Sequence, residues 1–341
     1  MSESSAGQPT ISVAMCTYNG ETYLAEQLES LLRQTRLPDE LVVCDDHSTD
    51  HTLQILEFFA AQSPFPIRII QNETRLGYNK NFEKALGNCT GDLIFVSDQD
   101  DYWLPEKIEE ISDFLMAHPD VDLVFSNAQV ADNQLNSTNM LFWERVSFTD
   151  DTRQRWVEGE ALDILLDGNR VMGCASAIRR DLLDAVLPIP DVPGYIYDGW
   201  MALVAAARGT IRFYEKPLLI YRTHENQQVG VRPEPTNRFV SLRERFTRAR
   251  SEKLQPFISK REQLRIIRHL LDERVPDSPF YIDHLQSRLD FYTVRSTLPR
   301  PRIHRFGPVM REWFRGNYKR FADPTAGWRA PIMAALGDLF E

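Results

Sequence analysis

Short apolar runs alternate with helix-forming segments between residues 11 and 97, and this rhythm constrains the fold more than any other feature of the chain. The apolar runs cover residues 11–17, 41–44, 67–70 and 93–96, and the segments 22–32, 49–59 and 79–86 between them are predicted helices. Strands that alternate with helices form a mostly parallel sheet with helices on its faces. We therefore predict an α/β fold with a doubly wound sheet.

The pattern changes after residue 230. Residues 1–9 are small and polar and predict a disordered tail, whereas residues 10–230 carry the strand and helix pattern, with a late strand at 217–222. Two prolines within residues 231–235 indicate a linker, and from about Asn237 the chain mixes charged and apolar residues as helices do. We expect an α/β domain at 10–230 and a mainly helical C-terminal region at 231–341.

An acidic cluster follows the fourth apolar run, where ligands of such sheets bind. Asp98, Asp100 and Asp101 stand so close in sequence that their charges would repel one another without a cation. Mg²⁺ or Mn²⁺ suits carboxylate oxygens and keeps coordination positions for phosphate oxygens. The cluster thus predicts a metal-bound diphosphate, and a solvated turn that caps the next helix is the alternative.

Polar residues also follow the earlier apolar runs. Tyr18 could stack on a nucleotide base, and Asp46 could accept a hydrogen bond from the imide N–H of uracil or thymine. Arg75 and Lys80 could meet phosphates. Taken singly, each residue also fits a structural role in a turn, a helix cap or a solvated loop.

The segments VAMCTYNG, VVCDDHSTD and VSDQDDYWLPEKI occur in this order, and together they resemble family 2 glycosyltransferases with the Rossmann-like GT-A fold. The resemblance covers roughly residues 11 to 230. It implies an inverting transfer in which Tyr18 and Asp46 hold the base, while Asp98 and Asp100 hold the ribose and the metal-bound diphosphate. The predicted nucleotide-binding residues are Thr17, Tyr18, Asn19, Glu21, Asp46, Lys80 and Asp98.

The same resemblance implies a carboxylate in the second half of the domain that acts as general base toward the acceptor hydroxyl. The best match is Asp198 in IYDGW, although Tyr197 and Gly199 stand where close members of this type carry a histidine and an aromatic residue. The alternative is that Asp198 caps the helix that begins there.

Residues 221–230, YRTHENQQVG, resemble a segment of bacterial rhamnosyltransferases, and Glu225 and Gln227 depart from its usual residues. This resemblance favours a dTDP-rhamnose donor, with a UDP-linked sugar as the other choice. His224 is the predicted third metal residue beside Asp98 and Asp100.

The acceptor is expected near Trp103, Gly173 and Trp200, because aromatic faces suit sugar rings. The alternative for both tryptophans is a buried structural role.

Charge and composition narrow the classes of partner and the location. The formal net charge of −10 argues against a nucleic-acid-binding protein. The N-terminus lacks the pattern of a secretory signal, no apolar run is long enough to span a membrane, and the four cysteines show no CxxC spacing. We expect a cytoplasmic protein with reduced cysteines.

The C-terminal region contains a basic and aromatic segment. Residues 295–320 hold eight basic residues and one acidic residue, Glu312, interleaved with aromatic side chains such as Phe306, Trp313 and Phe314. Such a mixture predicts that residues 295–321 contact the inner face of the cell membrane peripherally. The alternative is that these aromatic residues pack on the α/β domain.

The predicted function is that of an inverting, metal-dependent hexosyltransferase that moves a sugar, with rhamnose favoured, from a nucleotide diphosphate to a glycan or lipid-linked acceptor. Surface polysaccharide synthesis, such as that of O-antigen, is the expected setting. A non-catalytic sugar-nucleotide-binding protein is one alternative. A sugar nucleotidyltransferase is another, although TYNGETY lacks the Gly-rich basic loop of that class. The sequence leaves the oligomeric state open, a homo-oligomer included.

Overall fold

The computed structural model describes residues 7–225, 227, 249–276, 278, 281–322 and 327–340, and the chain divides into two compact units, Met1–Arg232 and Pro233–Glu341. The predicted linker at 231–235, the predicted start of the helical region near Asn237 and residues 1–6 of the predicted tail lie outside the described residues.

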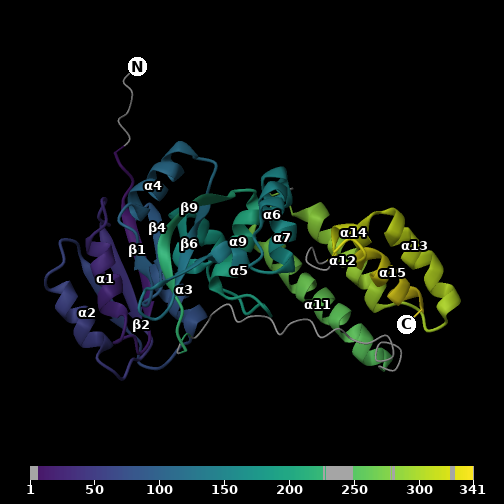
Figure 1. The fold of residues 1–341 in the computed structure, drawn as a ribbon, viewed down its shortest axis with the longest axis horizontal. Helices are drawn as coiled ribbons and strands as arrows, with labels where there is room; N and C mark the ends of the chain where they lie inside the picture. Colours follow the sequence, from purple (N-terminus) through teal and green to yellow (C-terminus); the bar gives the residue numbers. More distant parts are fainter. Residues whose placement is uncertain are drawn as a thin grey trace, which may run out of the picture. The chain divides into compact units, whose positions relative to one another are not determined.

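The first unit is built on one sheet, with strand order β3-β2-β1-β4-β8-β6-β9-β5 and with β7 paired to β6. The strands are β1 (Ile11–Thr17), β2 (Glu40–Asp45), β3 (Ile67–Gln71), β4 (Leu93–Ser97), β5 (Tyr102–Trp103), β6 (Leu123–Ala131), β7 (Ser137–Leu141), β8 (Ser176–Arg179) and β9 (Ile211–Arg222). Strands β1 to β4 are parallel, and β8 runs antiparallel to both of its neighbours. The prediction of a mostly parallel sheet flanked by helices is confirmed (Figure 1).

Helices of the first unit cover the sheet, so that every residue of β1 and β4 is buried. They are α1 (Leu24–Leu32), α2 (Thr52–Ala60), α3 (Tyr78–Asn88), α4 (Lys107–Ala117), α5 (Phe142–Arg145), α6 (Asp150–Arg155), α7 (Ala161–Asp167), α8 (Leu183–Val186) and α9 (Tyr197–Arg208). Strands buried on both faces carry continuous apolar runs, which explains the sequence pattern.

The second unit is helical in its described part. Its elements are α11 (Arg250–Arg274), α12 (Ile282–Ser296), the 3₁₀ turn η4 (Arg302–Arg305), α13 (Phe306–Phe314), α14 (Asn317–Arg320) and α15 (Ala330–Phe340). A small core joins α12, α13, α14 and α15 and is formed by Phe291, Leu298, Val309, Tyr318, Phe321 and Ala335. Among the described helices of the chain, none combines the length and the apolar character that a membrane crossing requires.

Candidate active site

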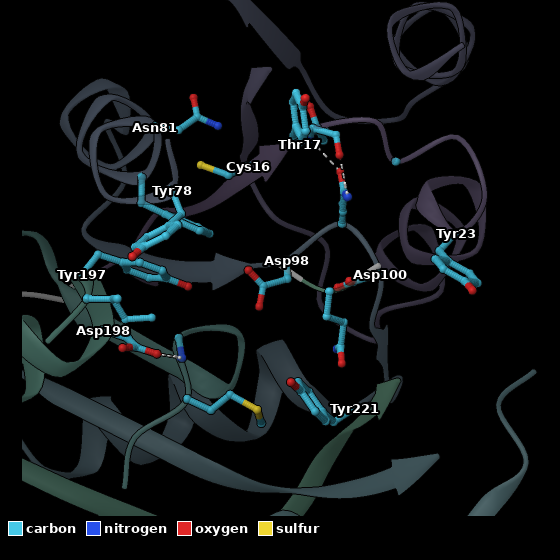
Figure 2. A pocket seen from close by; sticks show the side chains of 18 of the residues that line it. Cys16, Thr17, Tyr23, Tyr78, Asn81, Asp98, Asp100, Tyr197, Asp198 and Tyr221 are labelled. Atoms are coloured by element: carbon cyan, nitrogen blue, oxygen red, sulfur yellow. Dashed lines mark hydrogen bonds between the residues drawn. The ribbon is translucent and has the colours of Figure 1, made fainter. Parts of the chain in front are cut away.

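A cavity of about 550 Å³ lies at the carboxyl ends of β1, β2 and β4. Parallel strands end at the same edge of a sheet, and this brings the segments after these strands together. The predicted site residues that line the cavity are Thr17, Tyr18, Asn19, Asp46, Asp98, Asp100, Gly173, Asp198 and His224. Residues predicted to contact the base, the diphosphate and the acceptor hydroxyl therefore line one cavity, of which Figure 2 shows Asp98, Asp100 and Asp198.

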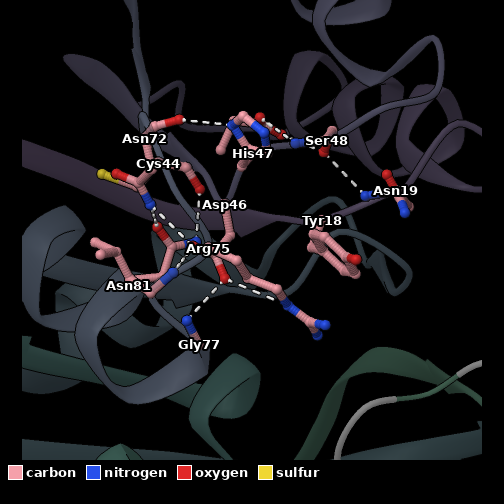
Figure 3. Close-up of polar contacts among 12 residues, drawn as sticks. Tyr18, Asn19, Cys44, Asp46, His47, Ser48, Asn72, Arg75, Gly77 and Asn81 are labelled. Atoms are coloured by element: carbon pink, nitrogen blue, oxygen red, sulfur yellow. Dashed lines mark hydrogen bonds and ion pairs between the residues drawn. The ribbon is translucent and has the colours of Figure 1, made fainter.

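Asp46 anchors the loop that follows β3. Its Oδ1 accepts hydrogen bonds from the amide of Leu76 at 2.6 Å and from Nδ2 of Asn72 at 3.1 Å, and its Oδ2 accepts one from the amide of Gly77 at 2.9 Å (Figure 3). Gly77 has a φ of 80°, a conformation that glycine adopts readily. Since a carboxylate offers about four lone-pair sites, Asp46 keeps the capacity to accept one further hydrogen bond.

Tyr18 presents an aromatic face beside Asp46. The guanidinium of Arg75 lies over this ring, with its Cζ 3.9 Å from the ring centroid, and Nε of Arg75 lies 3.9 Å from Oδ2 of Asp46. A flat, delocalised group therefore fits against Tyr18 within reach of the Asp46 carboxylate (Figure 3).

The acidic loop after β4 concentrates negative charge in the interior. Asp101 is fully buried, and neither of its carboxylate oxygens accepts a hydrogen bond from a nitrogen or oxygen of the described residues. Burial raises the pKa of Asp101 to about 7, and the neighbouring Asp100 charge contributes to this increase. Burial and the charges of Asp101 and Asp100 hold the pKa of Asp98 well above its usual range. This uncompensated charge fits a divalent cation, whose field would favour the ionised carboxylates.

The three residues predicted to bind metal lie along the same cavity but divide into two groups. Asp100 and His224 contact each other, with 2.8 Å between Oδ2 and Nε2. Potential ligand atoms of Asp98, by contrast, lie within 4.8 Å of those of Asp101 and Cys174. Asp101 belongs to the acidic cluster seen in the sequence, whereas nothing in the sequence indicates that Cys174 approaches it.

Arg222 fixes the acidic loop to the end of β9. Its fully buried guanidinium donates to the backbone carbonyls of Asp100 at 2.8 Å and of Asn133 at 2.7 Å, and it pairs with the carboxylate of Glu26. Three elements that are distant in sequence are thereby joined behind Asp100 and His224. Sequence reasoning missed this arginine, because its partners are mostly backbone carbonyls.

Asp198 lies in the first turn of α9, where backbone amides hold it. Its Oδ1 accepts hydrogen bonds from Nδ2 of Asn169 at 2.9 Å and from the amide of Gly199 at 2.5 Å, and its Oδ2 accepts one from the amide of Gly173 at 3.1 Å. Burial raises the pKa of Asp198 to about 7, although these hydrogen bonds act in the opposite direction. The N-cap position is occupied by Ile196, so Asp198 is not the cap of the helix.

Aromatic side chains that were not among the predicted contacts line another part of the cavity. The ring of Tyr197 stacks on Phe82, with centroids 3.8 Å apart, and Tyr78, Phe142 and Tyr221 line the same space. In Figure 2, the carboxylate of Asp98 points toward the side where Tyr197 and Asp198 lie. The adjacency of Tyr197 to Asp198 was the one sequence signal that could have indicated this part of the cavity.

Lys107, the first residue of α4, connects the acidic loop to the segment that holds Asp198. Its fully buried Nζ donates to the carbonyl of Cys174 and lies 3.6 Å from the centroid of the Trp103 ring. Burial lowers the pKa of Lys107 to about 7, whereas the charges of Asp101 and Asp98 favour its protonated form. Cys174 follows Gly173 in sequence, and the Gly173 amide donates a hydrogen bond to Asp198. The amino group of Lys107 therefore links the segment that holds Asp198 to the acidic loop.

Two residues predicted to bind nucleotide do not line the cavity. Glu21 accepts hydrogen bonds from the backbone and ring of His51. Lys80 donates to Glu83 at 2.8 Å and to the carbonyl of Ile189 at 3.2 Å.

The predicted acceptor contacts of Trp103 and Trp200 need correction. Both side chains are fully buried, and the indole N–H of Trp200 donates to the carbonyl of Val186 at 2.9 Å. They stabilise the interior and offer no face to a sugar ring. Gly173, the third predicted acceptor residue, does line the cavity.

Comparison with known proteins agrees with this geometry. Residues 12–187 match the model of the family described as Glycosyl transferase family 2. EpsE of Bacillus subtilis (strain 168) is 39% identical over 124 residues, which cover 36% of this chain and 45% of EpsE. The dTDP-rhamnosyl transferase RfbG of Shigella flexneri is 29% identical over 231 residues, which cover 63% of this chain and 73% of RfbG.

A glucosyltransferase and a solved structure extend the comparison. The UDP-Glc:alpha-D-GlcNAc-diphosphoundecaprenol beta-1,3-glucosyltransferase WfgD of Escherichia coli is 33% identical over 125 residues, or 36% of this chain and 47% of WfgD. The structure of S. aureus TarS 1-349 in complex with UDP-GlcNAc superposes with a TM-score of 0.56 at 19% identity, covering 88% of this chain and 79% of TarS. That likeness supports the fold. The match to EpsE and to WfgD thus spans less than half of each protein. Because the family model covers more than half of the chain, this protein belongs to glycosyl transferase family 2, with a GT-A fold.

Proposed function

We propose that the protein is an inverting, metal-dependent glycosyltransferase that moves a sugar from a pyrimidine nucleotide diphosphate to a glycan or lipid-linked acceptor. The observation that carries the proposal is the placement of Asp46, Asp98 and Asp198 along one cavity. These carboxylates come from three separate segments, and each suits a different part of the reaction.

The donor base is proposed to be uracil or thymine, stacked on Tyr18 and hydrogen-bonded through its imide N–H to Asp46. Both bases carry this N–H group, and the names of the relatives RfbG and WfgD include dTDP and UDP respectively. RfbG and the YRTHENQQVG segment favour rhamnose as the sugar.

A Mg²⁺ or Mn²⁺ ion is proposed to be held by Asp98, Asp100 and His224, with the buried carboxylate of Asp101 adding negative charge behind them. When bound, the cation stabilises the negative charge of the leaving diphosphate. The negative charges of Asp98, Asp100 and Asp101 repel one another, and the positive charge of the cation would offset this repulsion.

Asp198 is the proposed general base. A carboxylate whose pKa is raised to about 7 is a stronger base than an ordinary aspartate and still ionises near neutral pH. Its hydrogen bonds to Asn169, Gly173 and Gly199 fix its orientation toward an acceptor hydroxyl in the cavity. The name of WfgD specifies a lipid-diphosphate acceptor, and this favours a lipid-linked glycan of surface polysaccharide synthesis here.

The direct test is a thermal-shift panel of UDP-, dTDP- and GDP-sugars with and without Mn²⁺. We expect UDP- or dTDP-sugars to raise the melting temperature only with the cation, by an amount that corresponds to about 2–3 kcal/mol when ligand is present at roughly a hundred times its Kd. Chelation with EDTA should remove the shift, and transfer of labelled sugar should require the same donor and cation.

Other results would contradict the proposal in distinct ways. Equal shifts with all nucleotides would refute pyrimidine recognition, and an unchanged shift in EDTA would refute the metal requirement. Binding without any transfer or donor hydrolysis would indicate a non-catalytic sugar-nucleotide-binding protein. Release of pyrophosphate from a nucleoside triphosphate and a sugar phosphate would indicate a nucleotidyltransferase.

The rate of transfer should rise with pH on the acid side. Because Asp198 must be deprotonated to accept a proton, kcat/KM should fall about tenfold per pH unit below its pKa and level off above it. Burial places this pKa at about 7 in the protein alone, and a bound cation nearby would lower it. A pH–rate profile at saturating cation concentration measures this fall in kcat/KM. A profile that is flat from acidic to neutral pH would contradict the role of Asp198.

A further inference from the structure

Several helices of the second unit expose large apolar side chains, and three of the most exposed lie on α13 and the turn before it. Ile303 on η4 is 82% exposed, and Phe306 and Phe314 on α13 are 61% and 81% exposed. Phe306, Met310 and Phe314 are four residues apart along α13, with the half-buried Met310 between two exposed phenylalanines, while Val309 at the edge of this row is buried. Single exposed apolar residues are ordinary, but a row of them marks an interaction surface.

In this part of the unit, several basic side chains lie on the surface, whereas an acidic side chain lies in the interior. Arg302, Arg311 and Lys319 are exposed, and none of them forms an ion pair with a residue in the described part of the chain. Glu312, by contrast, is fully buried, where it accepts hydrogen bonds from Asn317 at 2.6 Å and from Arg315 at 3.0 Å.

A second acidic side chain of the helical unit also lies in its interior. Asp338 on α15 is buried and accepts hydrogen bonds from Tyr318 at 2.6 Å and from Arg295 at 2.7 Å. The fold therefore uses these carboxylates inside the unit and leaves cationic groups exposed on η4, on α13 and on the helix α14 that contacts α13.

We propose that this basic-aromatic face, made of Ile303, Phe306, Met310 and Phe314 with Arg302, Arg311 and Lys319, binds the surface of an anionic lipid bilayer. Aromatic and aliphatic side chains enter the boundary between headgroups and acyl chains, while arginine and lysine pair with lipid phosphates. The complementary charge favours an anionic bilayer over an uncharged partner. This inference goes beyond the proposed function, because binding to lipid requires neither donor nor catalysis.

The test is sedimentation of the full-length protein with vesicles of phosphatidylcholine that contain one third phosphatidylglycerol, compared with vesicles of phosphatidylcholine alone. The wild type should sediment with the anionic vesicles and remain in solution with the neutral ones. Two double variants, Phe306→Ser with Phe314→Ser and Arg311→Glu with Lys319→Glu, should each lower binding by about tenfold or more. The matched control is Phe58→Ser on α2, a phenylalanine that is 63% exposed outside the face and should bind as wild type does.

Equal binding to both kinds of vesicle, or wild-type binding by the Phe306/Phe314 variant, would overturn the proposal. A large fall in that variant's melting temperature would show instead that the face packs against another part of the chain. Conversion of an oligomer to a monomer, with vesicle binding unchanged, would identify a second copy as the occupant. Donor-induced thermal shifts should stay at the wild-type value in every variant, so a failure of lipid binding remains distinct from a failure of the proposed function.

Discussion

Replacing Asp198 by Asn is expected to leave donor binding intact and to lower sugar transfer by about 10² to 10⁴-fold. The amide has nearly the same size as the carboxylate, and its oxygen can still accept a hydrogen bond from Gly173 or Gly199. It cannot accept the proton of an acceptor hydroxyl. The variant should therefore show the wild-type thermal shift with donor and cation, together with a slow single-turnover rate of transfer.

A matched control separates loss of the base from loss of any buried carboxylate. Asp163 on α7 is also buried and does not line the cavity, so Asp163→Asn should retain transfer per folded molecule. Transfer by Asp198→Asn close to the wild-type rate would show that another group is the base. Loss of donor binding in this variant would show that Asp198 acts before the chemical step.

Replacing Lys107 by Met should destabilise the protein by about 1–3 kcal/mol, because the buried carbonyl of Cys174 loses the Nζ group that donates a hydrogen bond to it. The side chain of Met has a similar length, so the loss reports the ammonium group more than the lost volume. Urea unfolding of both proteins measures the difference.

The pH dependence of this loss has a defined sign. Burial raises the pKa of Asp101 to about 7, so the folded state binds a proton more tightly than the unfolded state does. Stability associated with Asp101 is therefore fully present below the ordinary aspartate pKa and is lost as the pH rises through about 7. Burial lowers the pKa of Lys107 to about 7, so the wild type gains the stability linked to this group as the pH rises above about 7, and the gap between variant and wild type should widen there.

Lys216 supplies the control for Lys107. It is an exposed lysine that pairs with Glu106 and Glu110, and Lys216→Met should unfold at nearly the same urea concentration as the wild type. A loss of similar size in both variants, or one that is independent of pH for Lys107→Met, would contradict the proposed role of Lys107.

The sequence predicted the half of the fold in which secondary structure follows local pattern. Strands β1, β2 and β4 are central and buried on both faces, so each appears as an apolar run followed by a helical period, whereas β3 is a half-buried edge strand with a weaker run. Strand β8 has four residues and runs antiparallel between β4 and β6, and no local pattern encodes such a pairing. The short helices α5 and α8, of four residues each, likewise lack a measurable period.

The candidate site divides in the same way. Residues directly after parallel strands, such as Tyr18, Asp46 and Asp98, could be predicted because strand ends converge by geometry. The groups that hold Asp198 could not be predicted, because Asn169 and the Gly173 amide come from a segment that does not directly follow a parallel strand. Trp103 and Trp200 show a further limit of sequence analysis, because the sequence does not reveal whether a tryptophan side chain faces a ligand or the core.

The contact of Lys107 with the carbonyl of Cys174 has a consequence for protein engineering. Exchange of the region from Asn169 to Trp200 between relatives, as a way to change the acceptor, would also replace the backbone on which this ammonium group rests. A chimera that keeps Lys107 but changes the path of that backbone should lose binding of the donor as well as selectivity for the acceptor. Successful grafts are expected to carry α4 with them as part of the transplanted module.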